Sequence, residues 1–341
     1  MCTRCEAMGH ALIPVITVLS LLISQGLLVS LQTTSGVYVV TVFPNLVSDI
    51  KLLLCDGDVV DYIIPPGVDP HEYQLTISDY QKLKRASIIV STGHTGAEVE
   101  IENLVEKGEL NATLINILEI PGIRITINPS SGQANLHMPI YDPLNYILFV
   151  ENLTSTLAKA NPLKADCYSD KALKLVNSLV SLVNKMMGKY RGMSTIIDLP
   201  EIQYAVEWMG FQVVKSLVPE HEVQPSPQDI ASVEGFMKSG SIPLVFITSP
   251  AASSESNALI ELSKKYNVTI IEVPSPLVNG SIPDKLYYIS SQVSSVNINE
   301  AGKPYTKLEE PSHLAPDPLS IILYVVIGVI IGLALSRWVY R

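Results

Sequence analysis

The chain has 341 residues, which is enough for two compact domains of ordinary size. Apolar residues make up 47% of it and charged residues only 16%, and this balance excludes a disordered chain. The formal net charge of −10 argues against a nucleic-acid partner, because such a partner selects a basic face.

Two uncharged segments account for much of the apolar excess. Residues 11–31 and 319–336 are each long enough to cross the roughly 30 Å hydrocarbon layer as a helix. The first follows Arg4, as a signal sequence would, but it is long for one and lacks an A-x-A cleavage site. A cleaved signal and a retained anchor therefore both stay open. Arg337 and Arg341 follow the second segment, which predicts a single-pass anchor with the soluble body outside the cell.

The soluble body contains two cysteines, Cys55 and Cys167. Outside the cell they could form a disulfide between the first part of the body and a central helix. Two separate buried thiols are the alternative, and the sequence favours neither.

The body begins with an alternation of strands and helices. Short β-branched runs predict strands, and apolar residues at three- and four-residue intervals predict helices. We expect strands over 37–43, 59–64 and 87–93, with helices over 46–54 and 76–86. This order favours a parallel sheet with helices on its faces.

The pattern changes near Asp142-Pro143. Residues 143–162 read as one helix, and residues 163–190 continue with helical spacing for nearly thirty residues, or roughly 40 Å. A helix of that length could join two lobes as a rigid strut. Two ordinary helices, broken within residues 161–170, are the alternative.

A second alternation follows the helices. We expect strands over 194–199, 211–218, 243–249 and 268–273, and helices over 201–210, 226–239 and 253–266. The predicted fold class is therefore α/β, with two parallel-sheet lobes joined by a long rigid helix. The predicted divisions are a signal or anchor (1–34), a first lobe (35–141), connecting helices (142–190), a second lobe (191–296), a polar tether (297–318) and a transmembrane helix (319–336).

Two histidines lie in loops of the first lobe. His71 follows the predicted strand 59–64, and His137 precedes the helix that starts near Asp142. Ligands of open α/β sheets bind beyond the carboxyl ends of the strands, and two imidazoles there could hold zinc or manganese. Spacing alone makes this a weak signal, because a single histidine is more often a surface or capping residue.

Three stretches carry a resemblance to a known family. "VTVFPNLVSDI", "IPPGVDPHEYQLTISDYQKLKRASIIV" and "HMPIYDPLNYILFVENLTSTLAKANP" resemble the cluster A-I solute-binding proteins of metal ABC transporters, as do "PSPQDI" and "VFITSP" in the second lobe. The likeness covers about residues 36–295. It implies one Zn²⁺ or Mn²⁺ ion held between two lobes as a transported ligand, and a partner permease in the membrane.

The resemblance also implies ligands. It makes His71 the first ligand and His137 the second, although Asp142 stands five positions after His137 where the family has four. The family's third position falls on Leu199 and its fourth on Ser275, and neither is a metal ligand.

Substitutes for the two missing ligands lie nearby. We predict Glu201 as the third ligand, with Asp198 as the alternative; their other roles would be an anion at a helix start and an N-cap. Four further side chains stay open as ligands, neighbours or plain surface residues: His94, His221, Glu72 and Glu255.

Three functions compete at this point. The leading one is a membrane-tethered binding protein that captures Zn²⁺ or Mn²⁺ for an ABC importer. The second is a surface interaction protein of the same fold that has lost metal binding, as the missing ligands suggest. An enzyme comes third, since no HExxH or nucleophile motif is present.

Overall fold

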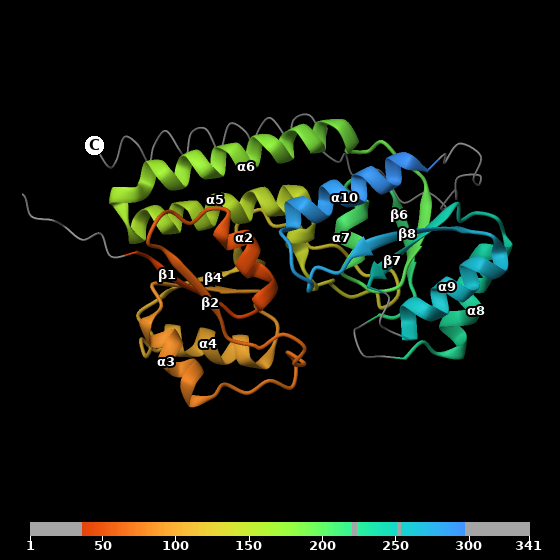
Figure 1. The fold of residues 1–341 in the computed structure, drawn as a ribbon. Helices are drawn as coiled ribbons and strands as arrows, with labels where there is room; N and C mark the ends of the chain where they lie inside the picture. Colours follow the sequence, from red (N-terminus) through yellow and green to blue (C-terminus); the bar gives the residue numbers. More distant parts are fainter. Residues whose placement is uncertain (1–35, 220–223, 251–253, 297–341) are drawn as a thin grey trace, which may run out of the picture. The chain divides into compact units, whose positions relative to one another are not determined.

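The first lobe is a four-stranded parallel sheet with helices on both faces (Figure 1). The computed structural model describes residues 36–219, 224–250 and 254–296. The strand order is β2-β1-β3-β4. The elements are β1 (Tyr38–Thr41), α2 (Val47–Lys51), β2 (Val59–Tyr62), α3 (Ile77–Arg85), β3 (Ile88–Ser91), α4 (Gly96–Glu106) and β4 (Thr113–Asn116).

The second lobe repeats this design. Its parallel sheet has the order β6-β5-β7-β8, which is the first lobe's order shifted by four strands. The elements are β5 (Ser194–Ile197), α7 (Ile202–Glu207), β6 (Gln212–Ser216), α8 (Pro227–Lys238), β7 (Leu244–Ser249), α9 (Ser254–Tyr266), β8 (Thr269–Pro274) and α10 (Ile282–Ser295). The predicted pair of parallel α/β lobes is confirmed.

Two helices, and not one strut, connect the lobes. Helix α5 covers Pro143–Ala160, and α6 covers Ala165–Met186. Asn161 leaves helical geometry, and Pro162 opens a 3-10 turn because it has no N–H to continue the ladder. The alternative of two helices broken within residues 161–170 is thus confirmed, and α6 is shorter at both ends than the expected 163–190. The remaining 22 residues of α6 extend about 33 Å.

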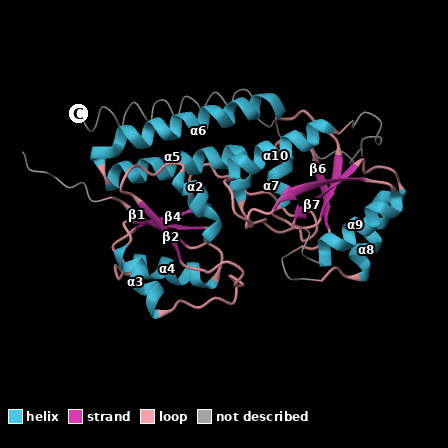
Figure 2. Cartoon of the chain, viewed as in Figure 1, coloured by secondary structure: helices cyan, strands magenta, loops and turns pink. Residues whose placement is uncertain are grey.

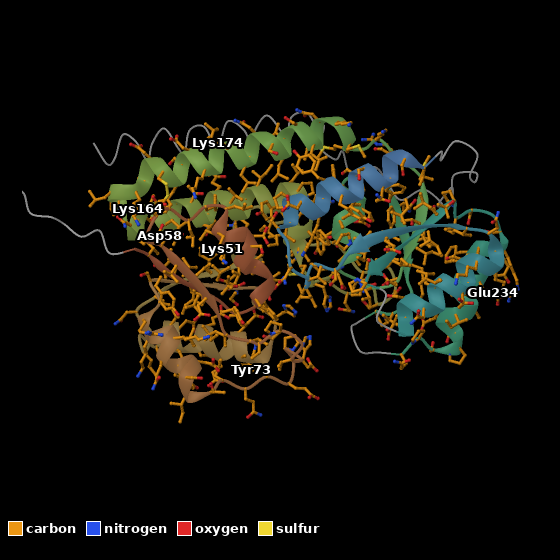
Figure 3. All side chains as sticks on the ribbon, in the orientation of Figure 1. Lys51, Asp58, Tyr73, Lys164, Lys174 and Glu234 are labelled. Atoms are coloured by element: carbon orange, nitrogen blue, oxygen red, sulfur yellow. A yellow bond between two sulfur atoms is a disulfide. The ribbon has the colours of Figure 1, made fainter. Side chains whose placement is uncertain are left out.

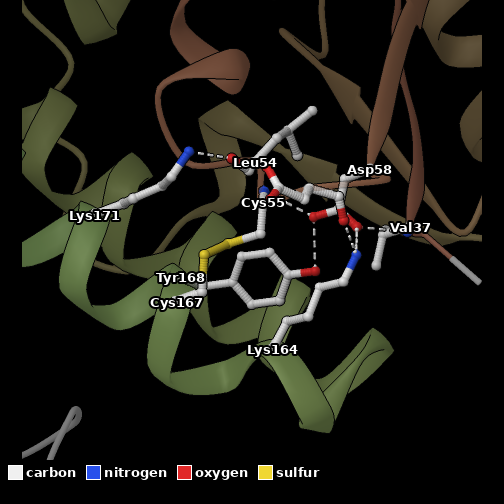
Figure 4. The surroundings of a disulfide bond; sticks show 9 residues. Val37, Leu54, Cys55, Asp58, Lys164, Cys167, Tyr168 and Lys171 are labelled. Carbon is white, nitrogen blue, oxygen red and sulfur yellow. Dashed lines mark hydrogen bonds and ion pairs between the residues drawn. A yellow bond between two sulfur atoms is a disulfide. The ribbon is translucent and has the colours of Figure 1, made fainter. Parts of the chain in front are cut away.

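Helix α6 contacts both lobes along its length. At its start, Cys167 forms a disulfide with Cys55, which decides against two separate thiols, and Lys164 and Tyr168 bond Asp58 at 2.8 and 2.9 Å (Figure 4). Further along, α6 meets α10 of the second lobe, where the Ser178 and Tyr287 hydroxyls hydrogen-bond. The helix is therefore attached to both sheets.

The main hydrophobic core includes residues of both lobes and of α5 and α6. These two helices lie side by side (Figure 2). The fully buried rings of the core come from the helices and from both lobes: Tyr141, Tyr146, Phe149, Tyr168, Tyr204 and Phe246. Separate clusters fill the outer faces of the sheets, one under α3 and α4 and the other under α8 and α9. A shared core of this kind resists independent movement of the lobes.

The predicted signal or anchor (1–34), the tether (297–318) and the transmembrane segment (319–336) lie outside the described residues. Within the described ranges, none of the helices combines the length and the apolar character that a membrane span requires.

Candidate functional site

His71 lies in the loop between β2 and α3. Its backbone N–H donates to the Asp69 carboxylate at 2.8 Å. Beyond it, Tyr73 donates its hydroxyl to Asp79 at 2.7 Å, and Thr76 and Asp79 form the capping box that starts α3 (Figure 3). The loop is thus anchored on both sides of an exposed histidine.

His94 lies in the next loop, between β3 and α4. Its Nδ1 is 3.2 Å from the Thr92 hydroxyl, which in turn contacts both carboxylate oxygens of Glu98 at 2.8 and 3.0 Å. Burial alone would raise the pKa of Glu98, but hydrogen bonds from Thr95 and Thr92 hold it below its usual value. Glu98 is therefore ionised and accepts the single Thr92 hydroxyl proton, so Nδ1 of His94 must donate to Thr92.

The His137 ring is oriented in the same way by an amide. Its Nδ1 is 3.2 Å from Oδ1 of Asn135. The Asn135 amide nitrogen donates to the Pro200 carbonyl and to Gln203, which assigns the facing atom as oxygen. His137 therefore also carries its proton on Nδ1, and the lone pair of a neutral ring lies on Nε2.

Glu201 comes from the second lobe, in the turn between β5 and α7, and only 1% of it is exposed. Burial raises the pKa of Tyr141 well above its usual value, and the nearby Glu201 charge raises it further. Asp198, three residues earlier, is fully buried, and it accepts hydrogen bonds from Leu199, Thr248 and Ser256. Burial raises the pKa of Asp198 to about 6.

One pocket collects side chains from both lobes. Its polar and apolar lining comprises Phe43, Asp69, Pro70, His71, Thr92, His94, His137, Met138, Glu201, Pro276 and Leu277. The rings of His71 and His94 are 5.8 Å apart between centroids, and those of His94 and His137 are 5.7 Å apart. Within the described residues, no three histidine, cysteine, aspartate or glutamate side chains are already arranged to hold a metal ion.

The other sequence candidates lie elsewhere. The residues lining the pocket do not include Asp198, Leu199, Glu72, Ser275 or Glu255. Glu72 is exposed, and Glu255 lies in the first turn of α9. His221 falls outside the described residues.

The far wall of the pocket is held across the lobes. Pro276 and Leu277 follow β8, and the Pro276 carbonyl accepts hydrogen bonds from Asn45 of the first lobe (3.1 Å) and from Lys285 of α10 (3.0 Å). Tyr141 donates to the Pro274 carbonyl on the same segment. The segment from Pro274 to Leu277 is therefore fixed beside the pocket.

Sequence reasoning did not find the residues that orient the imidazoles. Thr92 and Asn135 each stand two positions before the histidine that they contact. This two-position spacing is the only trace of the contact in the local sequence. A Thr or Asn before a histidine is too common to identify a residue that orients the ring.

Comparison with known proteins places the chain among metal receptors. Residues 39–290 match the model of the family ZnuA, zinc-uptake complex component A, periplasmic. The iron-binding protein YfeA of Yersinia pestis is 23% identical over 273 residues, covering 78% of this chain and 86% of that protein. The manganese-binding lipoprotein MntA of Halalkalibacterium halodurans is 26% identical over 220 residues, covering 62% and 71%.

A solved structure shares the fold. The solute-binding protein FpvC of Pseudomonas aeruginosa, in complex with Mn²⁺, superposes with a TM-score of 0.61 at 16% identity. The match covers 76% of this chain and 97% of that one. At this identity, the likeness concerns the fold alone.

Proposed function

The chain belongs to the family of the periplasmic component A of zinc-uptake complexes, and from this premise we propose that it captures a divalent transition metal for an ABC importer. Its curated relatives are named as binding proteins of metal transport and not as enzymes. The observation that carries the proposal is the convergence of three histidine-bearing loops of the first lobe and a buried glutamate of the second on one pocket.

We assign His71, His137 and Glu201 as ligands. The imidazoles bind through Nε2 when neutral, and the Glu201 carboxylate offsets part of the charge of the ion. Glu201 also bridges the lobes, since the two histidines belong to the first lobe. We assign Asp198 to holding the turn before Glu201, because its carboxylate already accepts hydrogen bonds from β7 and α9.

The ion would be Zn²⁺ or Mn²⁺, carried as cargo and passed to a membrane permease. Imidazole ligands suit zinc, and carboxylate oxygen suits manganese as well. Several relatives are named as lipoproteins and are thus anchored to a membrane. For this chain we propose that residues 319–336 supply the anchor, with the body outside the cell.

Calorimetric titration of the purified chain with Zn²⁺ and Mn²⁺ tests the function. We expect one ion per chain, and affinity that falls with falling pH, because protons compete with the ion for its ligands. His71→Ala, His137→Ala and Glu201→Ala should each remove most of the binding. Glu72→Gln is the matched control, because Glu72 adjoins His71 but is exposed and does not line the pocket.

Two outcomes would redirect the assignment. If Asp198→Asn abolishes binding in a folded protein while Glu201→Ala does not, the third ligand is Asp198. If the wild type shows no saturable binding of either ion at micromolar concentrations, the surface-interaction function takes the place of transport.

A further inference from the structure

The proposed site is one ligand short of a closed shell. His71, His137 and Glu201 supply three donors, whereas a zinc ion held by protein alone takes four in tetrahedral geometry. The family's fourth position is Ser275 here, and the Ser275 hydroxyl accepts a hydrogen bond from the Leu277 N–H at 3.1 Å. The second lobe therefore offers no second strong donor from that loop.

His94 lies where a fourth donor is needed. Its ring is 5.8 Å from that of His71 and 5.7 Å from that of His137 between centroids. Two imidazoles bound to one tetrahedral zinc ion at 2.0–2.1 Å have centroids roughly 5 Å apart. Each separation is thus within about 1 Å of that value. No three of these ligands are yet arranged around one point in the described residues, so binding would require the side chains to move.

Nε2 is the nitrogen that His94 could offer to an ion. Nδ1 donates to Thr92, so the lone pair of the neutral ring is on Nε2. Glu98 fixes this tautomer through the Thr92 hydroxyl. The arrangement has the form in which a carboxylate orients a metal-binding histidine through its second nitrogen.

We propose that His94 is the fourth ligand, and that the resulting set of three imidazoles and one carboxylate selects Zn²⁺ over Mn²⁺. This inference rests on the proposed function, and it moves a ligand from the second lobe to the first. Three donors then come from the first lobe, on the loops around His71, His94 and His137, and Glu201 alone comes from the second. Nitrogen-rich shells favour zinc, whereas manganese prefers oxygen.

X-ray absorption spectroscopy of the Zn²⁺-loaded full chain counts the imidazoles directly. The wild type should show three, and His94→Asn should show two. His94→Asn should also weaken Zn²⁺ binding by more than about 100-fold, beyond the loss usual for residues that only orient a ligand. Mn²⁺ binding should change less, so competition between the two ions should shift towards Mn²⁺. Thr92→Val should weaken Zn²⁺ binding about 10- to 100-fold with the count still at three.

The controls separate this inference from the function it rests on. His221→Asn tests whether His221 supplies the third imidazole in place of His94. Glu72→Gln should change neither the imidazole count nor the Zn²⁺ affinity. Two imidazoles in the wild type, or three in His94→Asn, would overturn the role of His94 while leaving metal capture intact. Two imidazoles in His221→Asn would name the other ligand. A wild type that binds no metal would instead overturn the proposed function.

Discussion

Removing the Cys55–Cys167 disulfide should lower the free energy of unfolding without disturbing the fold. The bridge closes a loop across 112 positions of sequence. In the chain-entropy model, a loop of that length stabilises the folded state by about 5 kcal/mol, through the freedom that it removes from the unfolded chain. The folded contact has other support, because Asp58 still bonds Lys164 and Tyr168 (Figure 4). The loss should therefore come from the unfolded state.

Denaturant unfolding of Cys55→Ala/Cys167→Ala measures this effect. The midpoint should fall, and the slope should rise, because an unbridged unfolded chain exposes more surface. Zn²⁺ affinity serves as the control, since the disulfide does not line the pocket and binding should persist. An unchanged midpoint would refute the entropic argument. Loss of metal binding in a folded variant would show that the bridge also positions the first lobe.

Two further predictions concern pH and the membrane. Burial raises the pKa of Asp49 from 3.8 to about 7, so the folded state holds this proton more tightly than the unfolded chain. The free energy of unfolding should fall by up to roughly 4 kcal/mol as the pH rises from about 4 to 7, and Asp49→Asn should flatten that slope in denaturant titrations. Truncation before Leu319 should move the chain from the membrane fraction to the soluble fraction. If the truncated chain stays in the membrane fraction and its N-terminus is intact, residues 11–31 are the anchor instead.

Both parallel sheets could be predicted from the sequence, because short β-branched runs that alternate with helical segments are typical of this fold class. The break between α5 and α6 was harder. Helical spacing continues across it, and only Asn161-Pro162 marks the boundary. The sequence of α10 does have the pattern of a helix, because Ile282, Leu286, Ile289 and Val293 recur at helical intervals; all four are buried. Its place against α5 and α6 depends on the shared core, which no local pattern shows.

The three histidines could not be grouped from their spacing. Positions 71, 94 and 137 are far apart in the chain, and each loop read alone as a surface loop. The strand order supplies what was missing, because β2 and β3 flank β1. Parallel strands end at the same edge of the sheet, so the loops that follow β2 and β3 are neighbours. His137 joins them because residues 126–135 hydrogen-bond to the α7 region of the second lobe.

The local sequence does not decide whether Asp198 or Glu201 is the third ligand. Both flank the position at which the family has its third ligand, and both are buried acids beside the start of α7. Their difference lies in the partners. Asp198 follows the end of β5 and bonds the adjacent strand β7 and helix α9, which ties the sheet together behind the pocket. Glu201 follows Pro200, after the turn, and this places it in the wall of the pocket. Glu201 and not Asp198 lines the pocket, and this position is the reason for proposing Glu201 as the ligand.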